Sequence, residues 1–348
     1  MVNQLLTNGI VLYPNKLFLN RKIRIGIVGS GTIAREHAKV VKSFNHTIIF
    51  LVTKTKSKKS LGFIREFNIS KHFTNLNIAI KKSKEIDAWI VATPWEVNTK
   101  ILKKLLDQPK PILIEKPILL KSGDIKKIIS LYKKANLKKI HIAYNRNFYD
   151  FIPVVVKNLI KKNNFIVQAN LSDTYNQIIR KRGNKIEPHL VKYITSHWIS
   201  FIYIICKNLN LKINFIKHKR ENSKLASIKY LLTKKTSKKT INYLNINFIP
   251  NCPKNLSIEF FMEDLYFLIS PLEEMRIYDK INLVKNKNEN SYKQILKKEY
   301  KLDKKFKPGF RSQYYEFIST AVTRKHSQLY STNFIDLYYI NKMCENLE

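Results

Sequence analysis

The fold of this chain is decided by residues 23–37, which read IRIGIVGSGTIAREH. The first five of them alternate apolar side chains with Arg24 and Gly26, a pattern typical of a β-strand. Residues 29–31 then supply a glycine turn, and the residues after it favour a helix that begins near Thr32. The segment therefore predicts a strand, a tight turn and a helix start in immediate succession.

This order of elements is the one that binds a dinucleotide in α/β proteins. Gly29 would permit the turn, Gly31 would let the backbone approach a pyrophosphate, and Ala34 is small enough for helix and strand to pack closely. Backbone N–H groups at the helix start, those of Thr32 and Ile33 among them, would hold the phosphates. A strand and a helix joined by glycines can also bind nothing, so the cofactor interpretation depends on the rest of the chain.

The composition is that of an ordinary globular protein except for its charge. The 348 residues can form two domains with separate cores, and hydrophobic residues make up 44% of them. A formal net charge of +39 would favour nucleic acid or an anionic surface. However, the lysines are spread along the whole chain, and the clusters at residues 54–59 and 234–239 are typical of solvated loops. We therefore expect no specific nucleic-acid partner.

The cysteines and the apolar segments bear on the compartment. Cys206, Cys252 and Cys344 are few, odd in number and far apart, which indicates the reducing cytoplasm, with no disulfide framework and no zinc or other metal site. The longest apolar candidate, residues 198–206, is shorter than the roughly 18 residues of a membrane span, so we expect no membrane partner. Residues 1–20 lack a small-residue cleavage site and are interpreted as an extension that precedes the first strand.

Strand and helix patterns alternate from residue 23 to about residue 143, which predicts a doubly wound, mostly parallel sheet. After the first strand we expect buried strands over residues 47–53, 86–92, 111–114 and 139–143, a helix through Leu105 and Leu106, and a helix over residues 124–135. Ligands of such sheets bind at the carboxyl ends of the strands. The candidates at these ends are Gly29, Thr93, Lys116 and Tyr144.

The end of the strand over residues 47–53 bears on the choice of cofactor. An acid that binds the ribose is expected there, about 20 residues after the glycines, but Thr53 and Lys54 occupy the place. A hydroxyl beside a basic side chain suits a 2′-phosphate better than a free 2′-hydroxyl. The sequence therefore slightly favours NADP over NAD, although Lys54 can also be one more lysine of a lysine-rich chain.

Beyond Asp150 the pattern becomes that of an α+β domain. Helices are expected over residues 152–161 and 191–206, with a strand over 165–172 and a polar loop between. A largely antiparallel sheet would follow, with strands over residues 213–217, 227–232, 240–249, 256–262 and 265–270, and a helix over 310–323 precedes the tail. The expected domains are an extension over 1–20, a dinucleotide-binding domain over 21–145 and an α+β domain over 146–348.

Several motifs, by their order and spacing, together resemble the Gfo/Idh/MocA family of NAD(P)-dependent oxidoreductases from Ile23 to the C-terminus. They are the glycine turn with His37, Ala92–Thr93–Pro94, Glu115–Lys116–Pro117, Tyr144 with Arg146, Ser196–His197–Trp198, Pro271–Leu272–Glu273 and residues 309–317. The resemblance implies a Rossmann domain and an α+β domain that binds substrate and assembles the chain into a dimer or tetramer. It also implies hydride transfer to or from a sugar, a nucleotide sugar or a related polyol.

The resemblance further implies what individual residues do. Lys116 would lie between nicotinamide and substrate, where a fixed cation orients the reacting hydroxyl and stabilises charge on its oxygen. The alternative is that Glu115 and Lys116 form a charged turn before a proline. Contacts with the cofactor are implied for Thr93, Pro94, Glu115 and Lys116, and contacts with the substrate for Tyr144, Arg146 and His197.

His197 matches the helix histidine that serves this family as general base or acid, because the pKa of histidine lies near the working pH. The family's usual aspartate four residues earlier is Tyr193 here, the acid that commonly follows is Ser200, and Asn98 replaces a histidine found after the Thr-Pro turn. The Tyr193 hydroxyl could still reach the same site and donate a hydrogen bond or a proton.

Other interpretations of the histidines stay open. On a helix this apolar, His197 could instead be a core residue, and His189 is then the reserve candidate for the acid or base. The sequence identifies no partner for the remaining candidates, which are His46, His72, His218 and His326. The departures at Tyr193, Ser200 and Asn98 also favour a second function, a regulatory or sensor protein that binds NAD(P) without turnover.

Overall fold

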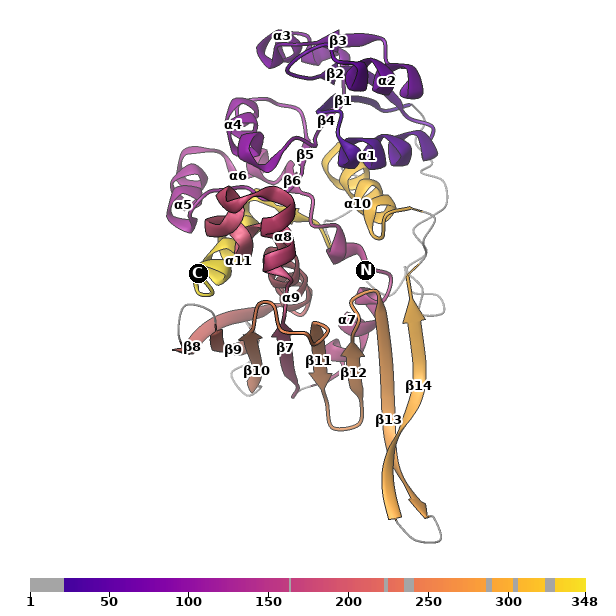
Figure 1. The fold of residues 1–348 in the computed structure, drawn as a ribbon, viewed down its shortest axis with the longest axis vertical. Coiled ribbons are helices and arrows are strands. Elements are labelled where there is room, and N and C mark those ends of the chain that lie inside the picture. Colours follow the sequence, from indigo (N-terminus) through magenta and orange to yellow (C-terminus); the bar gives the residue numbers. More distant parts are fainter. Residues whose placement is uncertain are drawn as a thin grey trace.

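The computed structural model describes residues 22–162, 164–221, 225–234, 241–285, 290–302, 306–322 and 329–348. The expected N-terminal extension, most of the lysine cluster at 234–239 and His326 lie outside these residues. So does the side chain of His218, although its backbone belongs to a strand. The described chain has two layers of sheet with helices between and around them (Figure 1).

The first sheet confirms the doubly wound prediction. Its strand order is β15-β6-β5-β4-β1-β2-β3, and β1 to β6 run parallel. The strands are β1 (Arg24–Val28), β2 (Thr47–Val52), β3 (Lys71–Phe73), β4 (Ala88–Val91), β5 (Ile112–Ile114) and β6 (Ile140–Ile142). This order reverses between β1 and β4, so the carboxyl ends of these two strands bound the place where such sheets bind ligands.

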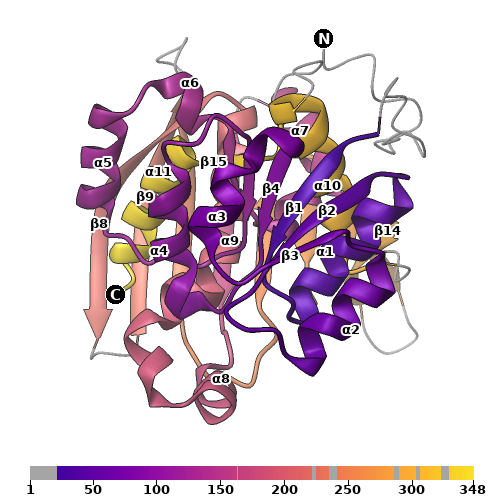
Figure 2. The same cartoon turned by 90° about the horizontal axis from the view of Figure 1, so that it is seen from above.

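Helices cover both faces of this sheet, as Figure 2 shows from above. Buried side chains of α1, α2 and α10 form one cluster with β1 and β2, and those of α3, α4 and α5 belong to a second cluster. The helices are α1 (Thr32–Ser43), α2 (Lys58–Phe67), α3 (Leu76–Lys81), α4 (Trp95–Leu105), α5 (Ser122–Leu131) and α6 (Lys134–Leu137). The single helix predicted over residues 124–135 is wrong, because an extended Tyr132 (φ −111°, ψ 144°) ends α5 and α6 begins two residues later.

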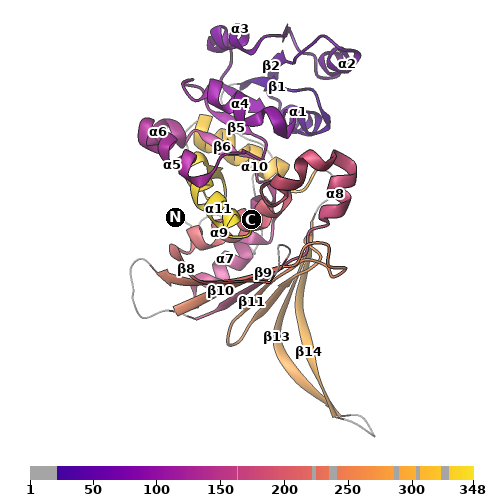
Figure 3. The same ribbon diagram turned by 60° about the vertical axis from the view of Figure 1, so that its left-hand side comes forward.

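The second sheet is antiparallel except where β7 and β10 run parallel, which confirms the largely antiparallel prediction. Its order is β14-β13-β12-β11-β7-β10-β9-β8. The strands are β7 (Ile166–Leu171), β8 (Leu211–Glu221), β9 (Leu225–Lys234), β10 (Ile241–Phe248), β11 (Ser257–Phe261), β12 (Tyr266–Ile269), β13 (Glu274–Lys285) and β14 (Asn290–Lys301). The sequence interpretation contained neither β13 nor β14, whose paired strands extend beyond the sheet (Figure 3).

The helices of the second half differ in part from expectation. The supposed polar loop after β7 contains α8 (Tyr175–Arg182), and the helix expected over 191–206 begins as a π-helical turn, η5 (Val191–Thr195), before α9 (Ser196–Asn208). The remaining helices are α7 (Ile152–Ile160), α10 (Phe310–Phe317) with the π-helical turn η6 (Ile318–Val322), and α11 (Phe334–Glu345). The helix expected over 310–323 is therefore α-helical only to Phe317.

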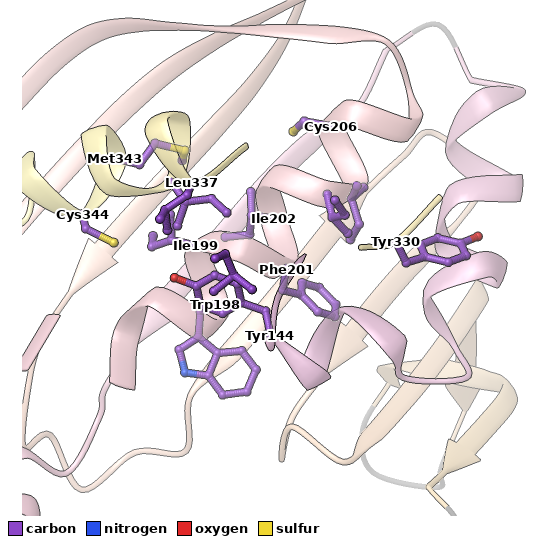
Figure 4. Packing of buried hydrophobic residues seen from close by; sticks show 14 of the residues in the cluster. Tyr144, Trp198, Ile199, Phe201, Ile202, Cys206, Tyr330, Leu337, Met343 and Cys344 are labelled. Atoms are coloured by element: carbon purple, nitrogen blue, oxygen red, sulfur yellow. The ribbon is translucent and has the colours of Figure 1, made fainter. Parts of the chain in front are cut away.

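The C-terminal segment returns to the first sheet. β15 (Thr332–Asn333) pairs antiparallel with β6 and adds an edge strand. Helix α11 then packs beside α9, where Leu337 and Met343 face Ile199 and Ile202 (Figure 4). Glu345 of α11 also accepts hydrogen bonds from the backbone N–H and the hydroxyl of Ser122, at the start of α5. The segment that the sequence interpretation treated as a tail thus contains helix α11, which contacts elements from both halves of the chain.

One further property of the helices concerns membranes. Among the helices that the structure describes, none combines the length and the apolar character needed to cross a bilayer.

Candidate active site

The glycine turn has the shape that a phosphate site needs. Gly29 has φ +106°, and a Cβ there would lie 2.3 Å from the carbonyl oxygen of Ala92, so only glycine fits. Gly31 is the N-cap of α1 without a side-chain hydrogen bond, and a Cβ on it would meet no heavy atom within 4 Å. The first N–H groups of α1, at Thr32 and Ile33, have no acceptor within the helix, so these residues fit the pyrophosphate of a dinucleotide.

At the end of β2, the hydroxyl of Thr53 already has partners. Its Oγ1 donates to the carbonyl oxygen of Thr55 (2.8 Å) and lies 2.7 Å from Nε2 of His72. Burial, and then the charge of Lys56, lower the pKa of His72. Lys54 is exposed. His72 therefore has a structural partner that the sequence did not identify, and Lys54 remains available to a ligand.

Asn98 ties two strand ends together. Its Oδ1 accepts a hydrogen bond from Thr93 Oγ1 (2.6 Å), and its Nδ2 donates to the carbonyl oxygen of Glu115 (2.9 Å). The side chain is fully buried. Asn98, at the position where the resemblance places a histidine, thus fixes the loops that follow β4 and β5 relative to each other. Pro94, which follows Thr93, is exposed and is the N-cap residue of α4.

Glu115 is also held by α1, the helix that follows the glycine turn. His37 of α1 lies with Nε2 2.9 Å from Glu115 Oε1, and its ring packs on Phe310 of α10 with the ring centres 4.7 Å apart. His37 is buried, whereas Glu115 keeps a partly exposed edge. The sequence marked both residues but did not predict that they would be bonded.

Lys116 contacts the segment that carries the proposed acid or base. Its Nζ donates to the carbonyl oxygen of Tyr193 and lies 4.9 Å from the centre of the Tyr193 ring. Tyr193 belongs to η5, and π-helical turns often occur at functional sites. The structure therefore brings Lys116 and Tyr193 together, with the tyrosine ring over the ammonium.

The surroundings of Lys116 lower its pKa to about 7. Burial is the main cause, because it disfavours the charged form. The nearby charges of Arg146 and Lys307 lower the pKa further, while Glu115 and Asp173 raise it. At neutral pH this amine can both hold and release a proton.

His197, a residue of α9, is buried against Tyr144. The two rings meet edge to face with their centres 5.8 Å apart, and His197 is 7% exposed. Burial first, and then the charges of Lys116 and Arg146, lower the pKa of His197 well below its usual value, so the imidazole is neutral at pH 7. Its Nδ1 has no hydrogen-bond partner in the described part of the chain. Burial also raises the pKa of Tyr144, opposed by its hydrogen bond to Ser196.

Arg146 is stacked on an aromatic ring at the site. Its guanidinium carbon lies 3.8 Å from the centre of the Trp198 ring, and its Nη1 is buried with no acceptor among residues 22–162 or the other described segments. Trp198 is itself held by a hydrogen bond, since its Nε1 donates to Asp173 Oδ1 (3.3 Å). Figure 4 shows Trp198 and Tyr144 next to each other beside α9.

Asp173 is the site residue that the sequence interpretation missed. It follows β7 directly, its Oδ2 accepts from Thr195 Oγ1 (2.6 Å), and its charge acts on both Lys116 and Arg146. Burial raises its pKa, and the hydrogen bonds from Thr195 and Trp198 oppose that rise. An acid at the end of a buried strand was a signal in the sequence, but the expected strand over 165–172 belonged to the second sheet, whose strand ends were given no role.

Other candidates have structural partners. Ser200 lies in a buried network with Asn147 and Thr332, so it does not take the place of an acid at the site. His46 Nδ1 lies 2.7 Å from the hydroxyl of Tyr314, so His46 has a partner that the sequence did not identify. His189 packs against Trp95, with ring centres 5.5 Å apart.

Comparison with known proteins agrees with this architecture. Residues 23–144 match the model of the oxidoreductase family with an NAD-binding Rossmann fold, GFO_IDH_MocA. Inositol 2-dehydrogenase 1 of Paenarthrobacter aurescens is 22% identical over 144 residues, 40% of this chain and 42% of that protein. The match thus spans about two fifths of the length of this curated relative.

Two solved structures share the fold over nearly the whole chain. UDP-N-acetylglucosamine 3-dehydrogenase of Acidithiobacillus ferrooxidans superposes with a TM-score of 0.63 at 12% identity, over 94% of this chain and 97% of that one. The transcriptional regulator Gal80p of Kluyveromyces lactis superposes with a TM-score of 0.68 at 16% identity, over 93% of this chain and 88% of that one. At such identities the likeness concerns the fold.

The family match begins at the first residue of the glycine-turn segment and ends at Tyr144, so it contains the glycine turn and Lys116. The motifs that suggested the resemblance in this half are the same ones that build the site described above. Residues 23–144 of this chain are thus similar to the NAD-binding Rossmann domain of the Gfo/Idh/MocA oxidoreductases.

Proposed function

We propose that this chain is an NAD(P)-dependent oxidoreductase that acts on the CH–OH group of a sugar, a nucleotide sugar or a related polyol. Lys116 carries the proposal. It extends from the carboxyl end of β5, contacts the carbonyl of Tyr193 and has a pKa of about 7. A buried amine that is still partly protonated at neutral pH can orient an alcohol and stabilise the charge that develops on its oxygen.

The cofactor would be held by the ends of β1, β4 and β5. The N–H groups after Gly31 suit its pyrophosphate, and Thr93, Pro94 and Glu115 would contact its nicotinamide half. When bound, the cofactor accepts or donates the hydride. The network of Asn98 and His37 fixes Thr93 and Glu115 before any ligand binds, which would reduce the ordering needed on binding.

We favour NADP as the natural cofactor. The segment after β2 reads TKTKSKKS over residues 53–60 and offers hydroxyls and lysines without an acid. Lys54 and Lys56 are both exposed there and could neutralise a 2′-phosphate. An acid that accepts from a free 2′-hydroxyl, the usual partner of NAD, is lacking in this stretch of sequence.

In the proposed reaction Lys116 orients the reacting hydroxyl and stabilises the charge that develops on its oxygen. His197 would act as the acid or base of the reaction, and its ring is neutral at pH 7, the form that accepts the proton in oxidation. Tyr193, whose ring covers the lysine, would donate a hydrogen bond to the substrate. Tyr144 and Arg146 would bind the rest of the substrate.

A second function is a regulator or sensor that binds NAD(P) and has lost turnover. The observation that favours it is the occupation of family positions by structural residues, because Asn98 and Ser200 are both buried in hydrogen-bond networks. The shared fold with a transcriptional regulator is consistent with such a function, since one fold can serve unrelated functions.

One experiment separates the two functions. Purified protein is mixed with NADP or NAD and a panel of sugars, inositols and nucleotide sugars, and the nicotinamide absorbance is followed. Turnover that is lost in Lys116→Ala but kept in Lys126→Ala, an exposed position on α5, supports the enzyme. Micromolar cofactor binding by calorimetry without turnover on any substrate supports the regulator.

We also propose that the chain assembles into a dimer or tetramer through the second sheet. Exposed apolar side chains on its strands, such as Phe215, Ile216 and Phe261, offer surface for such contacts. Light scattering coupled to gel filtration would give the mass of the assembly. A monomer at micromolar concentration would contradict this proposal.

A further inference from the structure

Three basic side chains gather at the proposed site. The charges of Arg146 and Lys307 lower the pKa of Lys116, and all three lower the pKa of His197. Two carboxylates face them. Glu115 is bonded to His37, and Asp173 accepts from Thr195 and Trp198. The hydrogen bonds of both carboxylates thus go to residues other than these three basic side chains.

Arg146 is built into this site rather than left on the surface. Its guanidinium lies flat on Trp198, which Asp173 holds through the indole N–H, and it is hydrogen-bonded to Tyr149. Nevertheless Nη1 is buried without an acceptor in the described chain. A buried charged donor without a partner is destabilising, so a fixed arginine in this state is expected where a ligand supplies the acceptor.

The kind of acceptor follows from the geometry of the guanidinium. A planar fork held by stacking binds carboxylate and phosphate oxygens in pairs, and it is over-represented where such groups are recognised. Hydroxyl groups of a neutral sugar need no such cation, because amides and hydroxyls bind them equally well. Lys307, whose ammonium lies 4.9 Å from the ring centre of Phe310, adds a second cation close enough to lower the pKa of His197.

We propose that the substrate of this site carries an anionic group, a carboxylate or a phosphate, which binds to Arg146 with Lys307 alongside. The inference rests on the proposed oxidoreductase function for the reacting end of the substrate, and it adds the class of substrate. Binding of the anion would bring a negative charge close to Lys116 and so raise the pKa of that amine.

Matched ligands test the proposal. D-Glucuronate, D-glucose 6-phosphate and UDP-glucose are each compared with D-glucose by titration calorimetry, on the protein with and without NADPH. We expect at least one of the anionic ligands to bind roughly tenfold or more tightly than glucose, as charge-assisted hydrogen bonds are worth. Which of the three binds distinguishes a sugar carboxylate, a sugar phosphate and a nucleotide diphosphate.

Two variants show whether Arg146 is responsible. Arg146→Met keeps an unbranched side chain against Trp198 and should bring the ratio of anionic to neutral affinity close to one. Arg65→Met, at an exposed position on α2, should leave the ratio unchanged, and circular dichroism should show that both variants are folded. Equal affinity of all four ligands in the wild type, failure of every anionic ligand to bind, or an unchanged ratio in Arg146→Met would each overturn the proposal.

The outcome is independent of turnover. Tight binding of an anionic ligand without hydride transfer would support the anion site and count against the oxidoreductase. Turnover of neutral sugars only, with no preference for anions, would support the oxidoreductase and count against the anion site.

Discussion

His37 of α1 and Glu115 after β5 are bonded to each other, with Nε2 and Oε1 2.9 Å apart. The helix of the glycine turn is thereby joined to the residue next to Lys116. Because His37 is 1% exposed, removal of its partner leaves a buried polar ring unpaired. We expect Glu115→Ala to lower the free energy of unfolding by about 1–3 kcal/mol in urea denaturation. Glu263→Ala, at an exposed turn, should change it by less than about 0.5 kcal/mol.

Substitution of the two glycines of the turn should affect different properties of the protein. In Gly29→Ala the new Cβ would lie 2.3 Å from the Ala92 carbonyl oxygen at φ +106°, so we expect a loss of stability above about 2 kcal/mol. Gly31→Ala has room for its Cβ and should keep the stability of the wild type. The same methyl group would extend into the space proposed for the pyrophosphate, so NADPH affinity should fall at least roughly tenfold. Thermal unfolding and NADPH fluorescence measure the two effects, and equal behaviour of the variants would contradict this assignment.

The pKa of Lys116 predicts a rise of stability with pH. Its folded-state pKa is about 7, below the value of 10.5 for the free side chain. Between these two pH values the unfolded chain binds a proton at this lysine that the folded chain lacks, so the free energy of unfolding increases as the pH rises. The difference between wild type and Lys116→Met should therefore grow in favour of the wild type by about 1–3 kcal/mol from pH 7 to pH 9. A difference that is flat with pH would show that the amine is not buried as described.

Asp173 should set the proton affinity of the site. Its negative charge raises the pKa of Lys116, so Asp173→Asn should lower that pKa further while keeping an oxygen that accepts from Thr195. Because the proposed role of Lys116 needs its protonated form, the alkaline limb of the profile of kcat/KM against pH should move to lower pH by about half a unit or more. Asp264→Asn, an exposed position after β11, is the matched control. An unmoved limb would mean that Asp173 acts only by holding Trp198 and Thr195.

The cofactor preference depends on the lysines after β2. If Lys54 and Lys56 contact a 2′-phosphate, Lys54→Ala with Lys56→Ala should weaken NADPH binding roughly threefold to tenfold and leave NADH binding unchanged. Fluorescence titration gives both dissociation constants. Lys59→Ala, farther along on α2, serves as control, and parallel loss of both cofactors would count against a 2′-phosphate contact.

The sequence predicts those parts of this fold that dense apolar runs encode. β1, β2 and β4 are buried on both faces, so their residues read as continuous or alternating apolar strands, and glycines mark the turn between β1 and α1. The β13–β14 hairpin has the opposite character. Its strands carry lysines between exposed apolar residues such as Ile281 and Tyr292, and neither a buried face nor a helical period identifies it.

The residues of the candidate site also divide into those that the sequence could predict and those that it could not. Residues at the carboxyl ends of parallel strands, Lys116 and Tyr144 among them, could be grouped by sequence alone because topology brings such ends together. Asp173 could not be grouped with them, since it comes from the second sheet and reaches Lys116 only through the packing of α9 between the sheets. Nor could the sequence show that Asn98 and Ser200 have buried structural partners, because that depends on contacts with Glu115 and Thr332.

The pairing of β15 with β6 has a consequence for how the protein is made. The edge of the first sheet is closed by residues 332–333, about 190 positions after β6 ends. A ribosome that adds about 5–20 residues per second therefore exposes the unpaired edge of β6, and the apolar face that α11 covers, for on the order of ten seconds or longer. The first sheet of this chain thus cannot be completed as it emerges, and its maturation waits for the last segment to be synthesised.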